Sequence, residues 1–395
     1  MEESSSLCKS LPHHFSSFVD AFVDFSVSGL FLSNAPTAHD SITPPLQTRL
    51  PSPSRLVAIG DLHGDLKKTR QALSVAGLID PISHRWIAGS TVAVQVGDVL
   101  DRGSDEIKLL YFLETLKRDA ARQGGAFLTM IGNHEVMNID GDFRFVTPSG
   151  LEDFRLWAHW YRIGNSMKSL CEGLAPPDDV FQGIPKKFNG IREEFHDGFH
   201  ARLAALRPNG PIARRFFSDN PTVLVVGNSV FVHGGLLEDH VMYGLERINM
   251  DVRDWINGLR GRISPGIVRG RNSVVWARQF SNSSEKNCDC SMLEHVLTRI
   301  PGVKRMIMGH TIQETGINGV CQNQAIRIDV GMSRGCGDGL PEVLEIDGNS
   351  GEIRVLTSNP LYRRNRFESG LEIGGKEGLA MLVPEQGSKQ VEVNA

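Results

Sequence analysis

The chain has 395 residues, of which 40% are hydrophobic and 22% are charged, and its formal net charge is −4 at pH 7. A chain of this length can bury a sizeable core without disulfides or metals to hold it together. The slightly negative balance argues against binding to nucleic acid or to an anionic membrane through bulk charge. No apolar run reaches the roughly 18 residues of a membrane span.

Residues 1–53 are predicted to form an N-terminal extension. Phe18, Phe22 and Phe25 recur at helical spacing and indicate one amphipathic helix that docks on the body of the protein. The Pro- and Ser-rich stretch PPLQTRLPSPS then predicts a linker. The first ten residues, MEESSSLCKS, lack the Arg-rich character of a transit peptide and the apolar centre of a secretory signal.

Three short apolar runs follow the linker, and each ends in Gly and a polar residue: RLVAIGD, STVAVQVGD and AFLTMIGN. The segments between them are helical in pattern. Leu109, Leu113, Leu116 and Ala120 lie on one helical face behind a predicted cap at Ser104. This alternation of strand and helix predicts an α/β fold with polar residues at the carboxyl ends of the strands, where such sheets bind their ligands.

Residues 138–218 are rich in aromatic residues mixed with charges, and predict a mostly helical insertion. Strand character returns in TVLVVGNSVFVHGG, with a hairpin turn at Gly-Asn, and again in VKRMIMGHT and AIRIDVGM. VLEIDGNSGEIRVL predicts a closing hairpin. We therefore expect one domain over residues 54–365 and a disordered tail over residues 366–395.

Five polar motifs follow the predicted strands in chain order: GDLHG, GDVLDRG, GNHE, VHGG and MGHT. They supply carboxylate or amide oxygens and imidazole nitrogens, the donors that first-row metals accept from mixed sites. One shared carboxylate can bridge two cations about 3.5–4 Å apart. The expected ligands are Asp61, His63, Asp98, Asn133, His233 and His310.

The order of these motifs resembles the PPP class of metal-dependent phosphoprotein phosphatases, within the wider calcineurin-like metallophosphoesterases. Inside that class the chain is most similar to the Shewanella-like protein phosphatases, in their cytosolic plant form. Leu100 stands where Val is usual before Asp101, the span from Glu135 to His233 is long, and no Ser-Ala-Pro-Asn-Tyr motif follows. The resemblance implies an α/β fold, with a β-sandwich flanked by helices and a helical insertion.

The resemblance also implies a role for each site residue. Asp61 and His63 would hold a first metal, Asn133, His233 and His310 a second, and Asp98 would bridge the two. His134 would be the general acid, with Asp101 orienting it. Arg102 would clamp the phosphate, and Arg278 in VVWARQF is the best match for a second clamping arginine.

The implied reaction is hydrolysis of a phosphomonoester by in-line attack of a hydroxide that bridges two divalent or trivalent metal ions. Mn²⁺ is expected to serve in vitro, and iron or zinc suits the same donors. The substrate would be a phosphoprotein, with Ser/Thr favoured and Tyr possible. No nucleic acid or membrane partner is expected, and no regulatory subunit is assigned.

Two alternatives stay open at this stage. The chain is also compatible with a metallophosphoesterase acting on dinucleoside polyphosphates or other small phosphoesters, since IDVGM resembles bacterial relatives. A protein of another class, a non-catalytic metal-binding scaffold, would dock a partner through the aromatic-rich insertion.

The six cysteines are sparse and include no CxxC pair. This usage favours a reducing compartment, so cytoplasm is expected, with the mitochondrial intermembrane space as the alternative. Cys288-Asp-Cys290 is compatible with a redox or zinc site. The favoured interpretation is nevertheless that these residues are ordinary thiols in and around a loop.

Overall fold

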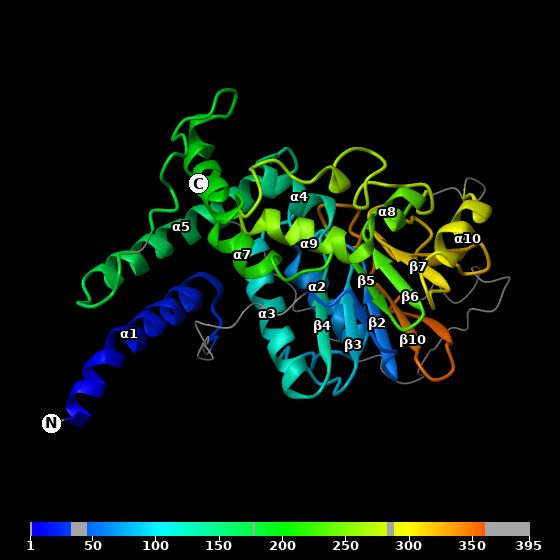
Figure 1. Cartoon of the computed structure of the whole chain (residues 1–395), viewed down its shortest axis with the longest axis horizontal. Coiled ribbons are helices and arrows are strands. Elements are labelled where there is room, and N and C mark those ends of the chain that lie inside the picture. The colour runs from blue at the N-terminus through cyan, green and yellow to red at the C-terminus, as the bar shows by residue number, and fades with distance from the viewer. Residues whose placement is uncertain (1, 33–45, 177, 283–287, 360–395) are drawn as a thin grey trace, which may run out of the picture.

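Two β-sheets packed face to face form the centre of the computed structural model, and helices surround them (Figure 1). The structure describes residues 2–32, 46–176, 178–282 and 288–359. The tail predicted over residues 366–395 lies outside this part of the chain. None of the helices within the described residues is long and apolar enough to cross a membrane.

The first sheet has five strands in the order β11-β10-β2-β3-β4. Its strands are β2 (Arg55–Ile59), β3 (Val92–Gln95), β4 (Ala126–Thr129), β10 (Glu342–Asp347) and β11 (Ile353–Thr357). The three apolar runs that the sequence places before GDLHG, GDVLDRG and GNHE are β2, β3 and β4, which pair in parallel. Their carboxyl ends therefore meet at one edge of the sheet.

The second sheet has six strands in the order β1-β5-β6-β7-β9-β8. Its strands are β1 (Arg49–Leu50), β5 (Val223–Val226), β6 (Ser229–Val232), β7 (Arg305–Met308), β8 (Asn318–Val320) and β9 (Ala325–Arg327). The predicted hairpin at Gly227 and Asn228 is confirmed, since β5 and β6 pair antiparallel across it. β6, β7 and β9 run parallel to one another.

Alternation along the strands builds the two halves of the core. Leu56 and Ala58 of β2 point between the sheets and pack in one apolar cluster with side chains such as Phe231 of the second sheet. Val57 and Ile59 point the other way, into a larger cluster shared with the helices. The expected sandwich flanked by helices is confirmed.

The helices lie outside the sheets and within the insertion (Figure 1). They are α1 (Glu2–Ser28), α2 (Leu66–Val75), α3 (Glu106–Arg122), α4 (Asn133–Asp140), α5 (Pro148–Ser169), α6 (His196–Leu206), α7 (Pro211–Phe217), α8 (Glu238–Tyr243), α9 (Leu245–Ile256) and α10 (Cys290–Thr298). Short 3-10 turns cover Glu193–Phe195 and Gly266–Val268. The predicted insertion over residues 138–218 is mostly helical, as expected.

The helix predicted around Phe18, Phe22 and Phe25 is α1, which lies beside α5 at the end of the molecule away from the sheets (Figure 1). The docking face is not the predicted one: Phe18 and Phe25 are exposed, and Val19 and Val23 are buried next to Gly164 of α5. A partly buried ion pair fastens α1 to the insertion: Arg215 of α7 donates to both carboxylate oxygens of Asp24, at 2.7 and 2.8 Å. The N-terminal extension is therefore packed against the insertion.

Two local predictions were wrong. The stretch PPLQTRLPSPS is not only a linker, because Arg49 and Leu50 form β1 and pair in parallel with β5. Backbone hydrogen bonding to an open sheet edge created this strand, and no sequence pattern within so short a run reports it. The helix α3 begins after Asp105 and not after the predicted cap Ser104.

Candidate metal centre

All six expected ligands lie at the shared edge of the two sheets, each just after a strand. Asp61 and His63 follow β2, Asp98 follows β3, and Asn133 opens α4 just after β4. His233 follows β6 and His310 follows β7. All six are buried, with exposed fractions of 8% or less. Side chains from positions as far apart as 61 and 310 therefore lie in one site, at the edge where the parallel strands end.

The carboxylate of Asp98 is at the centre of this site. Its Oδ2 lies 3.2 Å from Nε2 of His233, 3.7 Å from Nε2 of His63 and 3.8 Å from Nε2 of His134. Two groups of potential ligands contain it: one with His63 and His134, the other with His233 and His310. One carboxylate therefore faces two sets of donors, the arrangement that a bridging ligand requires.

Two of the histidines are fixed in the tautomer that a metal ligand needs. Nδ1 of His63 lies 3.0 Å from the carbonyl oxygen of Leu100, and Nδ1 of His233 lies 2.9 Å from that of Val96. A carbonyl only accepts, so Nδ1 carries the proton in each ring and Nε2 is directed at Asp98. Burial lowers the pKa of His63 to about 4, which keeps its Nε2 lone pair free at neutral pH.

His310 leaves a buried nitrogen without a partner. Its backbone N–H donates to Asp61, at 3.2 Å from Oδ2, but its ring Nε2 has no hydrogen-bond partner among the described residues. Burial, with the charges of His233 and Arg278, lowers the pKa of this ring to about 2, so the nitrogen presents a lone pair. Buried polar atoms are rarely left unsatisfied, and a cation would satisfy this one.

Asn133 and Asp98 converge on the same nitrogen. Asn133 Oδ1 lies 2.9 Å from Nε2 of His233, and Asp98 Oδ2 lies 3.2 Å from it. Burial opposes a charged ring, but the charge of Asp98 outweighs it and raises the pKa of His233. Three acceptor atoms that meet at one point need either a proton or a metal between them, and this donor set suits a first-row metal ion.

Asp329 belongs to the site, although the sequence analysis did not single it out. It is buried, and its carboxyl shares a hydrogen bond with that of Asp61. Burial raises the pKa of Asp329 to about 6, and burial and the neighbouring carboxylates raise that of Asp61 well above its usual range. Such a cluster needs a compensating cation. The Asp-x-Gly end of the strand-like run IDVG was the available signal.

Glu135 is a second residue whose role was missed. One of its oxygens accepts the backbone N–H of Asp98 and Gly132, both at 2.8 Å. The other accepts those of Val99, at 2.8 Å, and Leu100, at 3.1 Å. The carboxylate therefore ties the loop after β3 to the start of α4. Within GNHE, only its position directly after the expected general acid hinted at this role.

The backbone of the site is strained at three of the expected ligands. His63, Asp98 and His310 have φ values of 44°, 57° and 67°. Non-glycine residues rarely adopt this left-handed region, which is concentrated at functional sites. Gly132 contributes in another way, because a Cβ there would lie 2.2 Å from Asp98 Oδ1. Only glycine therefore lets the carboxylate approach α4.

His134 and Asp101 form a close pair beside the expected ligands. Nδ1 of His134 lies 2.6 Å from Oδ2 of Asp101, and both side chains are buried. Burial alone lowers the pKa of His134, but Asp98 and Asp101 outweigh it, so the net shift is upward. The ring therefore holds a proton more firmly than an ordinary histidine, as a proton donor near neutral pH must.

Both expected clamping arginines reach the rim. The guanidinium of Arg102 stacks on the ring of Phe145, 4.8 Å from its centroid, and Phe145 lies 5.1 Å from the ring of His134. Nη1 of Arg278 donates to the carbonyl of His310 at 3.1 Å and to the hydroxyl of Thr311 at 2.7 Å. The structure thus brings together all ten residues that the sequence nominated.

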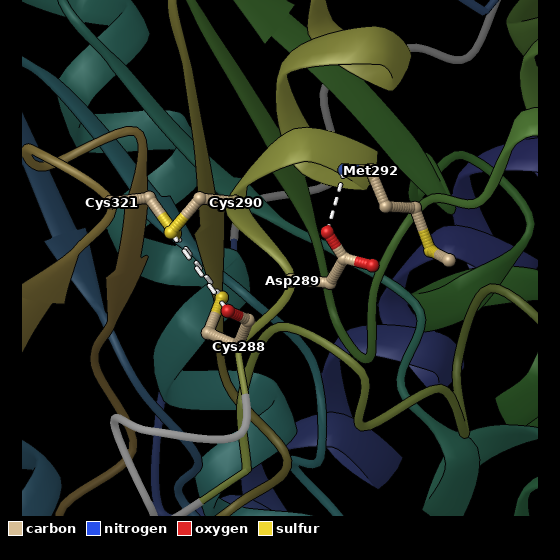
Figure 2. The surroundings of a disulfide bond; sticks show 5 residues. All are labelled: Cys288, Asp289, Cys290, Met292 and Cys321. Atoms are coloured by element: carbon tan, nitrogen blue, oxygen red, sulfur yellow. Dashed lines mark hydrogen bonds between the residues drawn. A yellow bond between two sulfur atoms is a disulfide. The ribbon is translucent and has the colours of Figure 1, made fainter.

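The interpretation of the late cysteines as ordinary thiols was wrong for Cys290 and Cys321, whereas Cys288 and Cys336 are free. Cys290, at the start of α10, forms a disulfide with Cys321, at the turn between β8 and β9 (Figure 2). The third sulfur, Cys288 Sγ, lies 3.4 Å from Cys321 Sγ. The pairing depends on a hairpin turn that brings position 321 against position 290, and the spacing of cysteines in the sequence does not report that contact.

Known proteins are similar in sequence to this chain over most of its length. A family model described as calcineurin-like phosphoesterase matches residues 54–314. The chain is 61% identical over 395 residues to Shewanella-like protein phosphatase 2 of Arabidopsis thaliana, covering 100% of this chain and 99% of that protein. It is 28% identical to Shewanella-like protein phosphatase 1 of Plasmodium berghei, covering 74% of this chain and 72% of the other.

Among solved structures, the chain is similar to the cold-active protein-tyrosine phosphatase of a psychrophilic Shewanella species. The TM-score is 0.54 at 20% sequence identity, over 78% of this chain and 82% of that one. This likeness concerns the fold.

Binding of Mn²⁺ to the metal-free protein is expected to release protons and to tighten as the pH rises through about 6 and above. Asp329 keeps its proton below a pKa of about 6. The cation also needs Asp61 deprotonated and Nε2 of His233 without a proton, and the pKa values of both groups are raised. Calorimetric titrations in two buffers of different ionisation enthalpy would count the protons released. Asp329→Asn should shift the increase in Mn²⁺ affinity to lower pH, because the charge of Asp329 raises the pKa of Asp61 and is absent from this variant. An Mn²⁺ affinity that does not change as the pH rises from about 5 would contradict this release of protons.

Proposed function

The chain belongs to the calcineurin-like phosphoesterase family and is a metal-dependent protein phosphatase, and we propose that it hydrolyses phosphoserine and phosphothreonine side chains at a two-metal centre. One observation carries the proposal. Asp98 lies close to His63 and also forms a group of potential ligands with His233 and His310, and the His134–Asp101 pair lies directly beside it. A ligand cradle and a proton donor at one point are the two parts that phosphomonoester hydrolysis needs.

The cradle divides the ligands as follows. Asp61 and His63 would hold one cation, Asn133, His233 and His310 the other, and Asp98 both. When bound, the cations would supply a hydroxide nucleophile near neutral pH and neutralise charge on the phosphoryl oxygens. Oxygen and nitrogen donors without sulfur suit manganese, iron and zinc.

The remaining side chains act on the substrate. Arg102 and Arg278 are placed at the rim, where guanidinium groups can clamp the phosphoryl oxygens in a fork. His134 would protonate the departing oxygen from Nε2, while Asp101 keeps its Nδ1 bonded and directs the ring. Asp98 also accepts the backbone N–H of His134, at 2.9 Å, so the proton donor and the ligand cradle are fixed to each other.

The proton donor supports serine and threonine as substrates. The alkoxide that leaves from phosphoserine is a strong base and needs a proton as it departs, whereas a phenoxide or nitrophenoxide leaves more easily without one. A buried histidine held by two carboxylates provides that proton. The partner is then a phosphoprotein.

The expected compartment, cytoplasm, stays a prediction. Disulfides are rare in the cytosol, so the Cys290–Cys321 bond favours the alternative, the mitochondrial intermembrane space.

A panel of phosphopeptides tests the substrate class directly. With Mn²⁺ present, peptides carrying phosphoserine or phosphothreonine are expected to be hydrolysed at kcat/KM values at least equal to that of the phosphotyrosine peptide, and a chelator should abolish turnover of all three. Diadenosine tetraphosphate serves as the comparison substrate. Turnover of that nucleotide well above turnover of every peptide would contradict the proposal.

The substitution His134→Asn tests the role of the proton donor. It should lower kcat on the phosphoserine peptide by about 10²-fold or more, the usual contribution of general acid catalysis. The loss on nitrophenyl phosphate should be much smaller, because that leaving group needs little protonation. Bound Mn²⁺, measured by elemental analysis, should not change. An equal loss on both substrates would show that His134 does not donate the proton.

A further inference from the structure

The helical insertion sends one arginine into the site. Arg202 lies on α6, between alanine and leucine neighbours, and its side chain is completely buried. Few arginines are buried to this degree unless they are paired with acidic groups. Its guanidinium lies 4.5 Å from the ring centroid of Phe154 and 5.6 Å from that of Phe143, so it is enclosed by aromatic side chains of the insertion.

The hydrogen bonds of this guanidinium connect it to His134 through Asp101, Asn138 and Glu106. Nη2 donates to Oδ1 of Asp101 at 3.1 Å, while Oδ2 of the same carboxylate accepts Nδ1 of His134 at 2.6 Å. Nε donates to Oδ1 of Asn138 at 2.8 Å, and the amide of Asn138 donates to the backbone carbonyl of His134 at 2.9 Å. Arg202 is therefore connected to the ring of His134 and to its backbone by separate routes.

A third route fixes the backbone of Asp101. Nη1 and Nη2 of Arg202 donate to the two carboxylate oxygens of Glu106, at 2.6 and 2.9 Å. Oε1 of Glu106 accepts the backbone N–H of Asp101 at 2.5 Å. Asp101 has a φ of 69°, a conformation that a non-glycine residue keeps only when its surroundings hold it there.

We propose that Arg202 is a positioning residue for the phosphatase reaction, which holds Asp101 and Asn138 so that the ring of His134 is aimed at the leaving oxygen. The inference rests on the proposed role of His134. It also gives the insertion over residues 138–218 a function, because this segment completes the proton donor of a site whose proposed ligands all follow strands of the two sheets.

The competing explanation is that the cluster only stabilises the fold. Buried ion pairs contribute little net stability, because desolvation of the charges offsets their attraction, yet removal of one partner is costly. Loss of stability alone therefore does not separate the two explanations. A selective loss on substrates that need a proton does, because a purely structural defect lowers turnover of all substrates alike.

The chain offers a matched control in Arg215. It is also an arginine of the insertion, and its two Nη atoms donate to the two carboxylate oxygens of Asp24. Its guanidinium lies 4.7 Å from the ring centroid of Tyr111. It contacts no member of the candidate metal centre in the described structure. Arg215→Met should therefore lower the thermal midpoint without changing the ratio of turnover between two substrates.

The test compares Arg202→Met, Arg215→Met and the wild type on the phosphoserine peptide and on nitrophenyl phosphate. Arg202→Met is expected to lower kcat on the peptide by about tenfold or more relative to kcat on nitrophenyl phosphate, part of the usual contribution of a general acid. Combined with His134→Asn, it should change the ratio no further, because residues that act through one group are not additive. Bound Mn²⁺ should stay at the wild-type level.

A spectroscopic signature gives a readout independent of turnover. In the metal-free protein, the short hydrogen bond from His134 Nδ1 to Asp101 should give a low-field proton resonance that disappears in Arg202→Met and persists in Arg215→Met. If Arg202→Met does not fold, Arg202→Lys replaces it: the charge remains, but the planar fork that serves two carboxylates is lost, so the selective loss should persist in smaller measure.

The outcomes separate this inference from the proposed function. If the wild type fails to hydrolyse the phosphoserine peptide, the proposed function falls and the inference with it. If the wild type is active but Arg202→Met lowers both substrates equally and keeps the low-field resonance, the inference alone is overturned.

Discussion

The structure depends on an unfavourable concentration of negative charge around Asp98. Asp61, Asp98 and Asp329 lie within one buried site. The neighbouring histidines lower the pKa of Asp98 well below its usual range, whereas burial and the neighbouring carboxylates raise the pKa values of Asp61 and Asp329. Cations shared through Asp98 would relieve this repulsion. Two backbone features help to build this site. Glycine at position 132 lets the Asp98 carboxylate approach α4, and left-handed backbone at His63, Asp98 and His310 turns these expected ligands inward.

Much of the fold and of the candidate site could be predicted from the sequence, because short local motifs mark the ends of the strands. An apolar run that ends in Gly and Asp, or in Gly, Asn and His, marks the carboxyl end of a strand. Parallel strands bring such ends to one edge, so the motifs predicted both the α/β sandwich and the meeting of residues as distant as Asp61 and His310. Hairpins were predictable for the same reason, since turn residues such as Gly227 and Asn228 lie next to the strands that they join.

The rest could not be predicted, because it depends on contacts between distant segments that have no local pattern. Arg202 lies 101 residues from Asp101, and an arginine in a helix of alanines and leucines is typical of an ordinary exposed position. Asp329 and the cysteines at 290 and 321 acquire their partners only when the second sheet forms. The sequence thus predicted which side chains gather at the centre and missed the residues that hold the centre in place.

The most direct test of the central claim is anomalous diffraction from crystals of the full chain soaked in Mn²⁺. Two anomalous peaks about 3.5–4 Å apart, one on each side of the Asp98 carboxylate, are the predicted result. A single peak, or two peaks that do not share Asp98, would contradict the account.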